Sequence, residues 1–198
     1  MIRIADYIRD IQPFDFSHLQ PWQISVNVKA IIETEIQKLG SDYSIDGNVA
    51  IHKSATIERG VILKGPIIIS QNCFIGAHAY LRGGVFLSGT VSVGPGCEIK
   101  SSFIFSNSAL AHFNFVGDSI IGSNVNMEAG SIIANHYNER EEKEISVLIN
   151  GQVIKTGSTK FGGLIGDGVK IGANAVLSPG TLLTSGTIVS RLQLISQV

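Results

Sequence analysis

The chain repeats every six residues over a long stretch that begins at Ile45. Twelve consecutive blocks cover residues 45–116, from IDGNVA to AHFNFV, and the first position of every block is Ile, Leu, Val, Phe or Ala. The fifth position of every block is Val, Ala, Ile, Cys or Phe. Because 44% of the chain is hydrophobic, chance would produce this agreement in a given frame about three times in a billion. The repeat is therefore a structural signal.

A period of six matches neither an α-helix nor a plain alternating strand. It fits a short strand followed by a tight bend, and three such sides close a triangular coil of about 18 residues. The first and fifth positions point inward, while Gly, Asn, Ser and Asp occupy the bends. Cys73 and Cys97 fall on inward positions, so we expect them to pack as small apolar groups. The sequence predicts an all-β protein, a parallel β-helix of the hexapeptide-repeat type.

The frame breaks after Val116, where a side of five residues replaces a side of six. The inward residues that follow are Ile121, Met127 and Ile133. A shortened side changes the direction of the side chains around it, so we expect a functional site in this region. The repeat stops at Asn135 and resumes from Ile165 to about Val189.

Two further segments complete the predicted organisation. Residues 135–163 form an insertion, a polar loop followed by a hairpin whose turn is Asn150-Gly151. Residues 1–42 contain a helix that starts at Pro21 and stops before Gly40. We expect this segment to cap the open end of the coils, because an uncovered end exposes unpaired strand edges. The β-helix domain then covers residues 43–198.

Composition excludes several classes of protein. The formal net charge is −1, with a sequence pI near 6.5, so we expect no nucleic-acid partner. Two Cys residues are too few for a disulfide scaffold. The N-terminal MIRIADYIRD contains no continuous apolar block, so we expect neither a signal peptide nor a membrane span, and a cytoplasmic protein.

Spacing singles out several polar residues. Arg82 and Lys100 lie 18 positions apart, so they stack on adjoining coils about 5 Å apart at the backbone; a phosphate between them or solvated surface charge would both explain this. His112 points outward on a different side, as a general base or as an ordinary exposed histidine. Asn126 and Asn135 flank the stretch before the insertion, as site residues or as turn residues.

Metal binding is not predicted. His52, His78 and His136 show no ligand spacing with His112.

Four stretches, YLRGG, CEIKSS, AHFNFVGDSIIGSNVNMEAGSIIAN and FGGLIGDGVKIGANAVLSPGT, carry a resemblance to a known family. They resemble the acetyltransferase half of the bifunctional N-acetylglucosamine-1-phosphate uridyltransferase / glucosamine-1-phosphate acetyltransferase family, and the insertion is similar to archaeal sugar-1-phosphate members. The resemblance covers residues 80–181. It implies a left-handed β-helix, a homotrimer with each site between subunits, and acetyl-CoA as co-substrate.

The same resemblance implies roles for individual residues. Arg82 and Lys100 would bind the phosphate of the acceptor, His112 would be the general base, and Asn126 would contact the sugar. The residues implied at acetyl-CoA are Ala129 through its backbone, Asn135, His136 and Ala173. No metal is implied in the active site.

Three departures from the family leave the acceptor open. Phe115 stands at a sugar-contacting position where the family usually has Tyr, His136 replaces a second Tyr, and Lys143 is the nearest counterpart of a basic loop residue. We expect a CoA-dependent N-acetyltransferase acting on an amino-sugar 1-phosphate, without a uridylyltransferase domain. The alternatives are an acyltransferase for another sugar phosphate or nucleotide sugar, and a non-catalytic sugar-phosphate-binding or assembly module. A separate nucleotidyltransferase as partner is left open.

Overall fold

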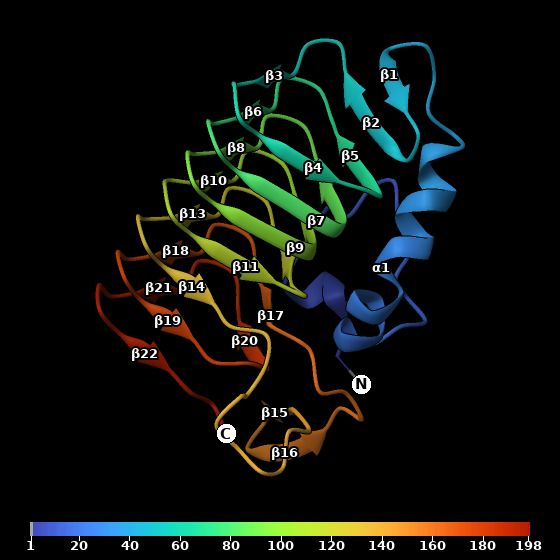
Figure 1. The fold of residues 1–198 in the computed structure, drawn as a ribbon. Coiled ribbons are helices and arrows are strands. Elements are labelled where there is room, and N and C mark those ends of the chain that lie inside the picture. Colours follow the sequence, from blue (N-terminus) through green and yellow to red (C-terminus); the bar gives the residue numbers. More distant parts are fainter. Residues whose placement is uncertain (1) are drawn as a thin grey trace.

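The computed structural model describes residues 2–198 as a three-sided parallel β-helix with one long α-helix along its flank (Figure 1). Strands of one coil pair in parallel with strands of the next on every side. The first side is a sheet of seven strands, which are β3 (Thr56–Ile57), β6 (Phe74–Ile75), β8 (Ser92–Val93), β10 (Ala109–Leu110), β13 (Asn126–Met127), β18 (Lys170–Ile171) and β21 (Ile188–Val189). This is the fold class that the hexad repeat predicts.

The second and third sides form one continuous sheet, because two strands run through the corner between them. The second side contains β4 (Ile62–Lys64), the first halves of β7 (Tyr80–Leu87) and β9 (Glu98–Ile104), β11 (Phe115–Gly117), β14 (Ile132–Ile133), β19 (Val176–Leu177) and β22 (Leu194–Ile195). The third side contains β2 (Val49–His52), β5 (Ile67–Ile69), the second halves of β7 and β9, β12 (Ile120–Ile121), β17 (Gly163–Ile165) and β20 (Thr181–Leu183).

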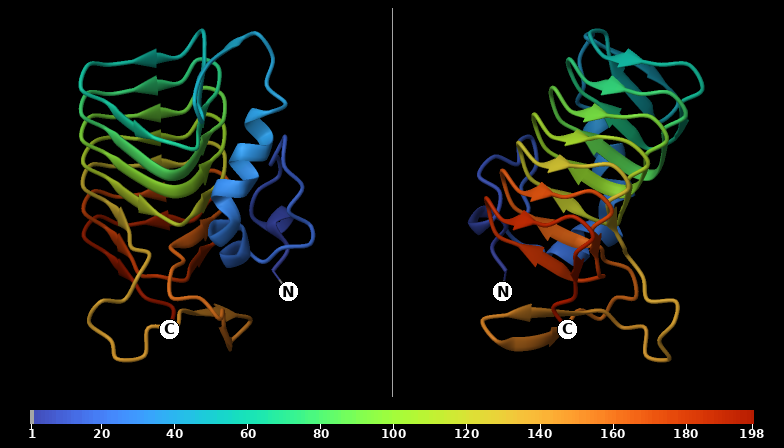
Figure 2. Two further views of the ribbon diagram at one scale, coloured as in Figure 1. Left: turned by 45° about the vertical axis from the view of Figure 1, so that its right-hand side comes forward. Right: turned by 90° about the vertical axis from the view of Figure 1, so that its left-hand side faces the viewer.

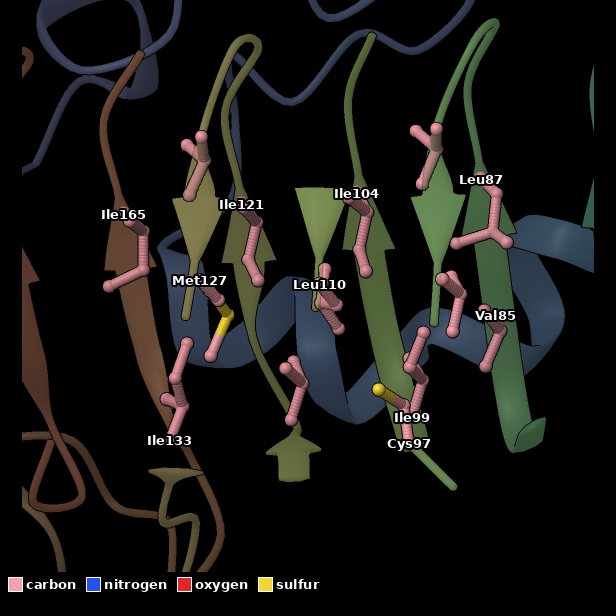
Figure 3. Packing of buried hydrophobic residues seen from close by; sticks show 14 of the residues in the cluster. Val85, Leu87, Cys97, Ile99, Ile104, Leu110, Ile121, Met127, Ile133 and Ile165 are labelled. Carbon is pink, nitrogen blue, oxygen red and sulfur yellow. The ribbon is translucent and has the colours of Figure 1, made fainter. Parts of the chain in front are cut away.

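The interior of the coils is a column of small and medium-sized apolar side chains. Figure 3 shows part of it, in which Leu87, Ile99 and Ile121 point into the same space from successive coils. Cys73 and Cys97 are buried in this column as free thiols, as predicted. Burial raises the pKa of the Cys73 thiol to about 11, so this group stays protonated at neutral pH.

The predicted frame is wrong by one residue between Lys100 and Phe115. It places Phe105 and Ala111 inside the coils, whereas the inward residues are Ile104 and Leu110. Phe105 instead packs on the outer face of the third side. The repeat alone could not separate these choices, because neighbouring positions on this stretch are also apolar.

The physical cause is a shortened corner one coil earlier than predicted. Arg82 pairs with Lys100 and Val85 pairs with Ser102, so two glycines in β7 lie opposite Ser101 alone in β9. The predicted short side after Val116 is present as well. Two successive coils are therefore one residue short at the corner between the second and third sides.

The coils also begin later than predicted. Ile45 lies in β1 (Tyr43–Asp46), which pairs antiparallel with β2 and is not part of a coil. The first inward residues belong to β2, starting with Val49. β1 thereby covers the outer edge of the first third-side strand, which would otherwise expose unpaired backbone groups.

The predicted helix is present as α1 (Pro21–Ile36), preceded by a short 3-10 helix, η1 (Ile4–Asp6). Its predicted place as a cap over the coil end is wrong, because α1 lies lengthwise against the third side (Figure 2). The outer face of that side is apolar and forms a second core with the N-terminal segment. Its members on the coils include Ala50, Ile68, Phe86, Phe103, Ile120, Leu164 and Leu182.

The insertion has the predicted hairpin, which extends beyond the C-terminal coil (Figure 2). β15 (Ser146–Ile149) pairs antiparallel with β16 (Gln152–Lys155). Asn150 and Gly151 have φ of 49° and 78°, the positive values that a type I′ turn requires. Ile145 and Val147 join the second core, so the insertion is anchored to the third side as well. Among residues 2–198, no helix combines the length and the apolar character needed to cross a bilayer.

The second core makes the N-terminal segment part of the folding unit. Phe103 is fully buried there and contacts Phe14 edge-on, with 5.1 Å between ring centroids. We expect Phe103→Ala to lower the free energy of unfolding by about 3–5 kcal/mol, measured by urea denaturation. Val26 is 66% exposed on α1, so Val26→Ala is the matched control. We expect it to change the free energy of unfolding by less than about 0.5 kcal/mol. Equal effects of the two substitutions would contradict this account of the third side.

Candidate active site

Arg82 and Lys100 lie beside each other on adjoining coils, as their spacing predicts. They are in register between β7 and β9 at the end of the second side. Each cation already has a carboxylate partner within the chain. The Arg82 guanidinium lies 2.7 Å from Glu98 Oε1, and Lys100 Nζ lies 2.6 Å from Asp118 Oδ2. The chain thus supplies the anions that keep the two stacked cations from repelling each other.

Glu98 and Asp118 are candidate site residues that the sequence patterns did not indicate. Glu98 precedes Lys100 by two positions on the same strand face, and Asp118 follows it by 18. Both spacings are visible in the sequence. The Lys100–Asp118 contact depends on the short corner at Ser101, whereas the Arg82–Glu98 contact follows from the register of β7 and β9.

The first residue of the insertion joins the same group. The Asn135 amide donates a hydrogen bond to the Asp118 carboxylate. The position of Asn135 requires a glycine in β11, because a Cβ on Gly117 would lie 2.7 Å from Asn135 Cγ. His136 follows, with Nδ1 3.3 Å from the carbonyl oxygen of Thr159. Arg82, Glu98, Lys100, Asp118 and Asn135 are called the cation group below.

His112 lies at the corner between the first and second sides, two residues after the end of β10. Its side chain is exposed, as predicted, although the frame shift moves it one position along the corner. The backbone there is held from both neighbouring coils. Gly130 N–H donates to the His112 carbonyl at 2.9 Å, and Phe113 N–H donates to the Pro95 carbonyl at 3.1 Å. The imidazole is therefore presented outward from a fixed backbone.

Asn114 gives this corner further support from inside the coil. It is buried, and its amide donates to the Glu128 carbonyl at 2.7 Å and to Ser131 Oγ at 2.9 Å. A polar side chain at an inward position is costly unless it is hydrogen-bonded. Asn114 meets that condition and ties the His112 corner to the next coil.

Asn126 lies on the first side, in a groove of about 410 Å³ lined also by Glu128, Lys170, Ile188 and Arg191. The Glu128 carboxylate accepts hydrogen bonds from Ala173 N–H at 2.9 Å and from Arg191 Nε at 2.9 Å. These interactions, the Arg191 guanidinium first, lower the pKa of Glu128 to about 2.

Some backbone N–H groups near His112 already donate a hydrogen bond within the chain, and one does not. Gly130 N–H is used by the His112 carbonyl and Ala173 N–H by Glu128. Ala129 lies between His112 and Ala173 in the stack of coils. Its carbonyl accepts a hydrogen bond from Asn174 N–H at 3.0 Å. Within residues 2–198, no hydrogen bond is donated by the Ala129 N–H.

The predicted residues therefore form two groups within one chain. His112, Ala129 and Ala173 stack at the corner between the first and second sides, with the groove that holds Asn126 beside them. The cation group lies at the opposite end of the second side. Phe115 is half-buried between them, in register with Glu98. No group of three or more metal-ligating side chains occurs within residues 2–198.

Comparison with known proteins places this architecture in a family. The family model described as GMPPB C-terminal domain matches residues 63–161, half of the chain. A bifunctional sugar-1-phosphate nucleotidylyltransferase/acetyltransferase of Sulfurisphaera tokodaii is 30% identical over 96% of this chain and 48% of its own length. Bifunctional protein GlmU of Methanococcus vannielii is 34% identical over 86% of this chain and 41% of its own length.

A solved structure, the hexapeptide transferase family protein from Anaplasma phagocytophilum, is 17% identical over 75% of this chain and 74% of that one, with a TM-score of 0.42. This likeness is too weak to bear on the fold or the function of the chain.

The coils, the corner histidine and the cation group define a hexapeptide-repeat β-helix protein. The chain belongs to the GMPPB C-terminal domain family. The resemblance predicted from the motifs is confirmed by the relatives, of whose length the chain spans about half.

The contact between Glu128 and Arg191 predicts a titration. We expect Arg191→Met to raise the pKa of Glu128 from about 2 toward its ordinary value of 4.5, because the main hydrogen bond to the carboxylate is lost. Since the folded-state pKa is lowered, the stabilisation from this pair is present above pH 4.5 and is lost as the pH falls toward 2. Carboxyl-carbon NMR measures the pKa.

Arg140→Met is the control for this titration, because Arg140 stacks on Tyr137 with its Cζ 3.5 Å from the ring centroid. It should leave the Glu128 titration unchanged. A Glu128 pKa that stays near 2 in Arg191→Met would contradict the assigned cause.

Proposed function

We propose that the protein is a CoA-dependent N-acetyltransferase whose acceptor is an amino-sugar 1-phosphate. The observation that carries the proposal is an exposed imidazole on a fixed corner together with stacked cations on the same side of the coils. The relatives support it, since one of them is named a sugar-1-phosphate nucleotidylyltransferase/acetyltransferase. A groove that combines apolar Ile188 with cationic Lys170 and Arg191 suits a co-substrate with an apolar arm and phosphates.

In this proposal Arg82 and Lys100 hold the acceptor phosphate and so position the amine. The amine nitrogen bonds to the acetyl carbonyl carbon of acetyl-CoA, the carbon–sulfur bond breaks, and CoA leaves as the thiol. In this scheme His112 takes the proton from the attacking nitrogen and passes a proton to the leaving sulfur. The Ala129 N–H is the backbone donor left to stabilise the negative charge on the carbonyl oxygen.

We also propose that the protein works as a homotrimer, with each site shared by two subunits. His112 and the cation group lie at opposite ends of the second side of one chain, whereas a neighbouring subunit could bring its own cation group to His112. Helix α1 covers the third side, which leaves the first and second sides for subunit contacts. Phe113, Leu192 and Leu194 are 72%, 79% and 65% exposed on the first-to-second corner and second side, which favours an interface there.

His112→Asn tests the role of the imidazole. We expect kcat to fall by about 10²–10⁴-fold, with the fold intact by circular dichroism, measured as CoA release from acetyl-CoA and glucosamine 1-phosphate. His78 is exposed at the same kind of corner with φ of 61°, a conformation that Asn also adopts. His78→Asn is therefore the matched control and should keep wild-type turnover. Full activity of His112→Asn would exclude it as the base.

Subunit mixing tests the shared site. His112→Asn and Lys100→Met should each be nearly inactive alone. After mixed refolding we expect activity to return, because some interfaces then pair an intact His112 with an intact cation group. Mass photometry reports the oligomeric state of each sample. A monomer with full activity, or mixed trimers without recovered activity, would rule out the shared site.

The alternative acceptor is another sugar phosphate or a nucleotide sugar. Phe115 favours it, because this half-buried side chain between the two groups has no hydroxyl to offer a sugar. Rates with glucosamine 1-phosphate, galactosamine 1-phosphate and UDP-amino sugars separate the acceptors. Binding of sugar phosphate without binding of acetyl-CoA would instead indicate a non-catalytic module. A separate nucleotidyltransferase as partner stays a prediction.

A further inference from the structure

Lys64 is a third cation in the row that contains Arg82 and Lys100. β4 pairs in parallel with β7 so that Lys64 is in register with Arg82, and β7 pairs with β9 so that Arg82 is in register with Lys100. Adjoining strands lie about 4.8 Å apart. The three side chains therefore start from successive rungs of one outward-facing row at the end of the second side.

The three cations differ in their charge balance. Arg82 is paired with Glu98, and Lys100 with Asp118. Within residues 2–198, no carboxylate lies within 4.0 Å of the Lys64 ammonium. The two paired cations are neutralised by their partners, so the net positive charge of the row comes from Lys64.

An aromatic ring keeps Lys64 close to Arg82. Lys64 Nζ lies 5.1 Å from the centroid of the Tyr80 ring, and Arg82 Cζ lies 5.6 Å from the same centroid. Both distances are within the range of a cation–π contact. Tyr80 thus favours a Lys64 side chain that lies along the row toward Arg82.

A phosphate arriving at Arg82 and Lys100 meets two carboxylates as well as two cations. The electrostatic attraction of the phosphate to those four groups is weak because their charges cancel. Hydrogen bonds of good geometry are then the main contribution to phosphate binding. One further unpaired cation on the next rung makes the local potential positive. A neutral hydroxyl in place of the phosphate gains nothing from that charge.

We propose that Lys64 is a specificity-determining residue of the acetyltransferase site, and that its charge selects phosphorylated amino sugars over neutral ones. The proposal rests on the proposed function. It adds that Lys64 makes the acceptor site electropositive, and that this charge disfavours neutral amino sugars as acceptors.

The test compares two acceptors that differ in the phosphate. Wild type, Lys64→Met, Lys64→Arg and the control Lys53→Met are assayed with glucosamine 1-phosphate and with glucosamine. Lys53 is likewise exposed, on the coil before β4. For Lys64→Met we expect kcat/KM with glucosamine 1-phosphate to fall about tenfold, the size of one charge-assisted contact, and kcat/KM with glucosamine to change less than about twofold.

Two further variants and the salt dependence test whether the effect comes from the charge of Lys64. Lys64→Arg should keep the preference for the phosphorylated acceptor, and Lys53→Met should match wild type. The phosphate preference of wild type should weaken with added salt more than that of Lys64→Met, because salt screens exposed charges. An equal loss with both acceptors, no loss with either, or a changed oligomeric mass of Lys64→Met would overturn the proposal.

A binding measurement separates this proposal from the proposed function. Calorimetric titration with glucosamine 1-phosphate and with inorganic phosphate needs no turnover. Weaker phosphate binding by Lys64→Met than by wild type would support Lys64 as the anion-selecting residue. If the wild type also transfers no acetyl group, the role of Lys64 stands and the acetyltransferase proposal is contradicted. Unchanged phosphate binding would overturn the role of Lys64 whatever the activity.

Discussion

The hydrogen-bonded stacking of each coil on the next is the constraint on which the other features depend. Each parallel strand takes its edge partners from the adjoining coils, 17 or 18 residues away in the sequence or 44 across the insertion. The inward side chains of one coil pack on those of its neighbours. This arrangement holds outward side chains at matching positions in successive coils about 4.8 Å apart. It is why Lys64, Arg82 and Lys100 form a row, and why the carbonyl of His112 meets the N–H of Gly130.

The two shortened corners give the site its local geometry. In a coil of ordinary length, three residues form the corner between the second and third sides, as residues 82–84 do. In each of the next two coils this corner has only two residues, 100–101 and 117–118. Ser101 and Asp118 turn these tight corners with φ of 49° and 47°. Asp118 is thereby brought beside Lys100 and Asn135, and the insertion starts from this point. The shortened corners thus bring Asp118 and Asn135 to Lys100, whereas the Arg82–Glu98 pair is set by the register of β7 and β9.

Sequence patterns predict the structure correctly where the chemistry is periodic or local. The hexads predict the parallel coils and the burial of Cys73 and Cys97, and Asn150-Gly151 predicts the hairpin turn. The outward placement of His112 and the pairing of Arg82 with Lys100 follow from the same period. Lys64 has the same spacing and could have been found in the same way. The ion pair of Lys100 with Asp118 depends on the missed short corner, so spacing alone could not assign it. The Arg82–Glu98 pair lies before that corner and follows from the register of β7 and β9.

The place of the N-terminal segment shows the limit of pattern reasoning. Pro21 and the apolar spacing that follows indicate a helix, but not the surface that it covers. That surface was decided by the apolar outer face of the third side, where Phe86 and Phe103 need a cover and α1 with Phe14 provides it.

The sequence by itself determined the three-sided coil, because an inward apolar residue at every sixth position leaves few other ways to bury them all. Only the tertiary structure decided which coils are short, which carboxylate meets which cation, and which side the helix covers. Those outcomes depend on contacts between residues far apart in the chain, and their free energies are set by the packing of neighbouring coils and not by any local pattern.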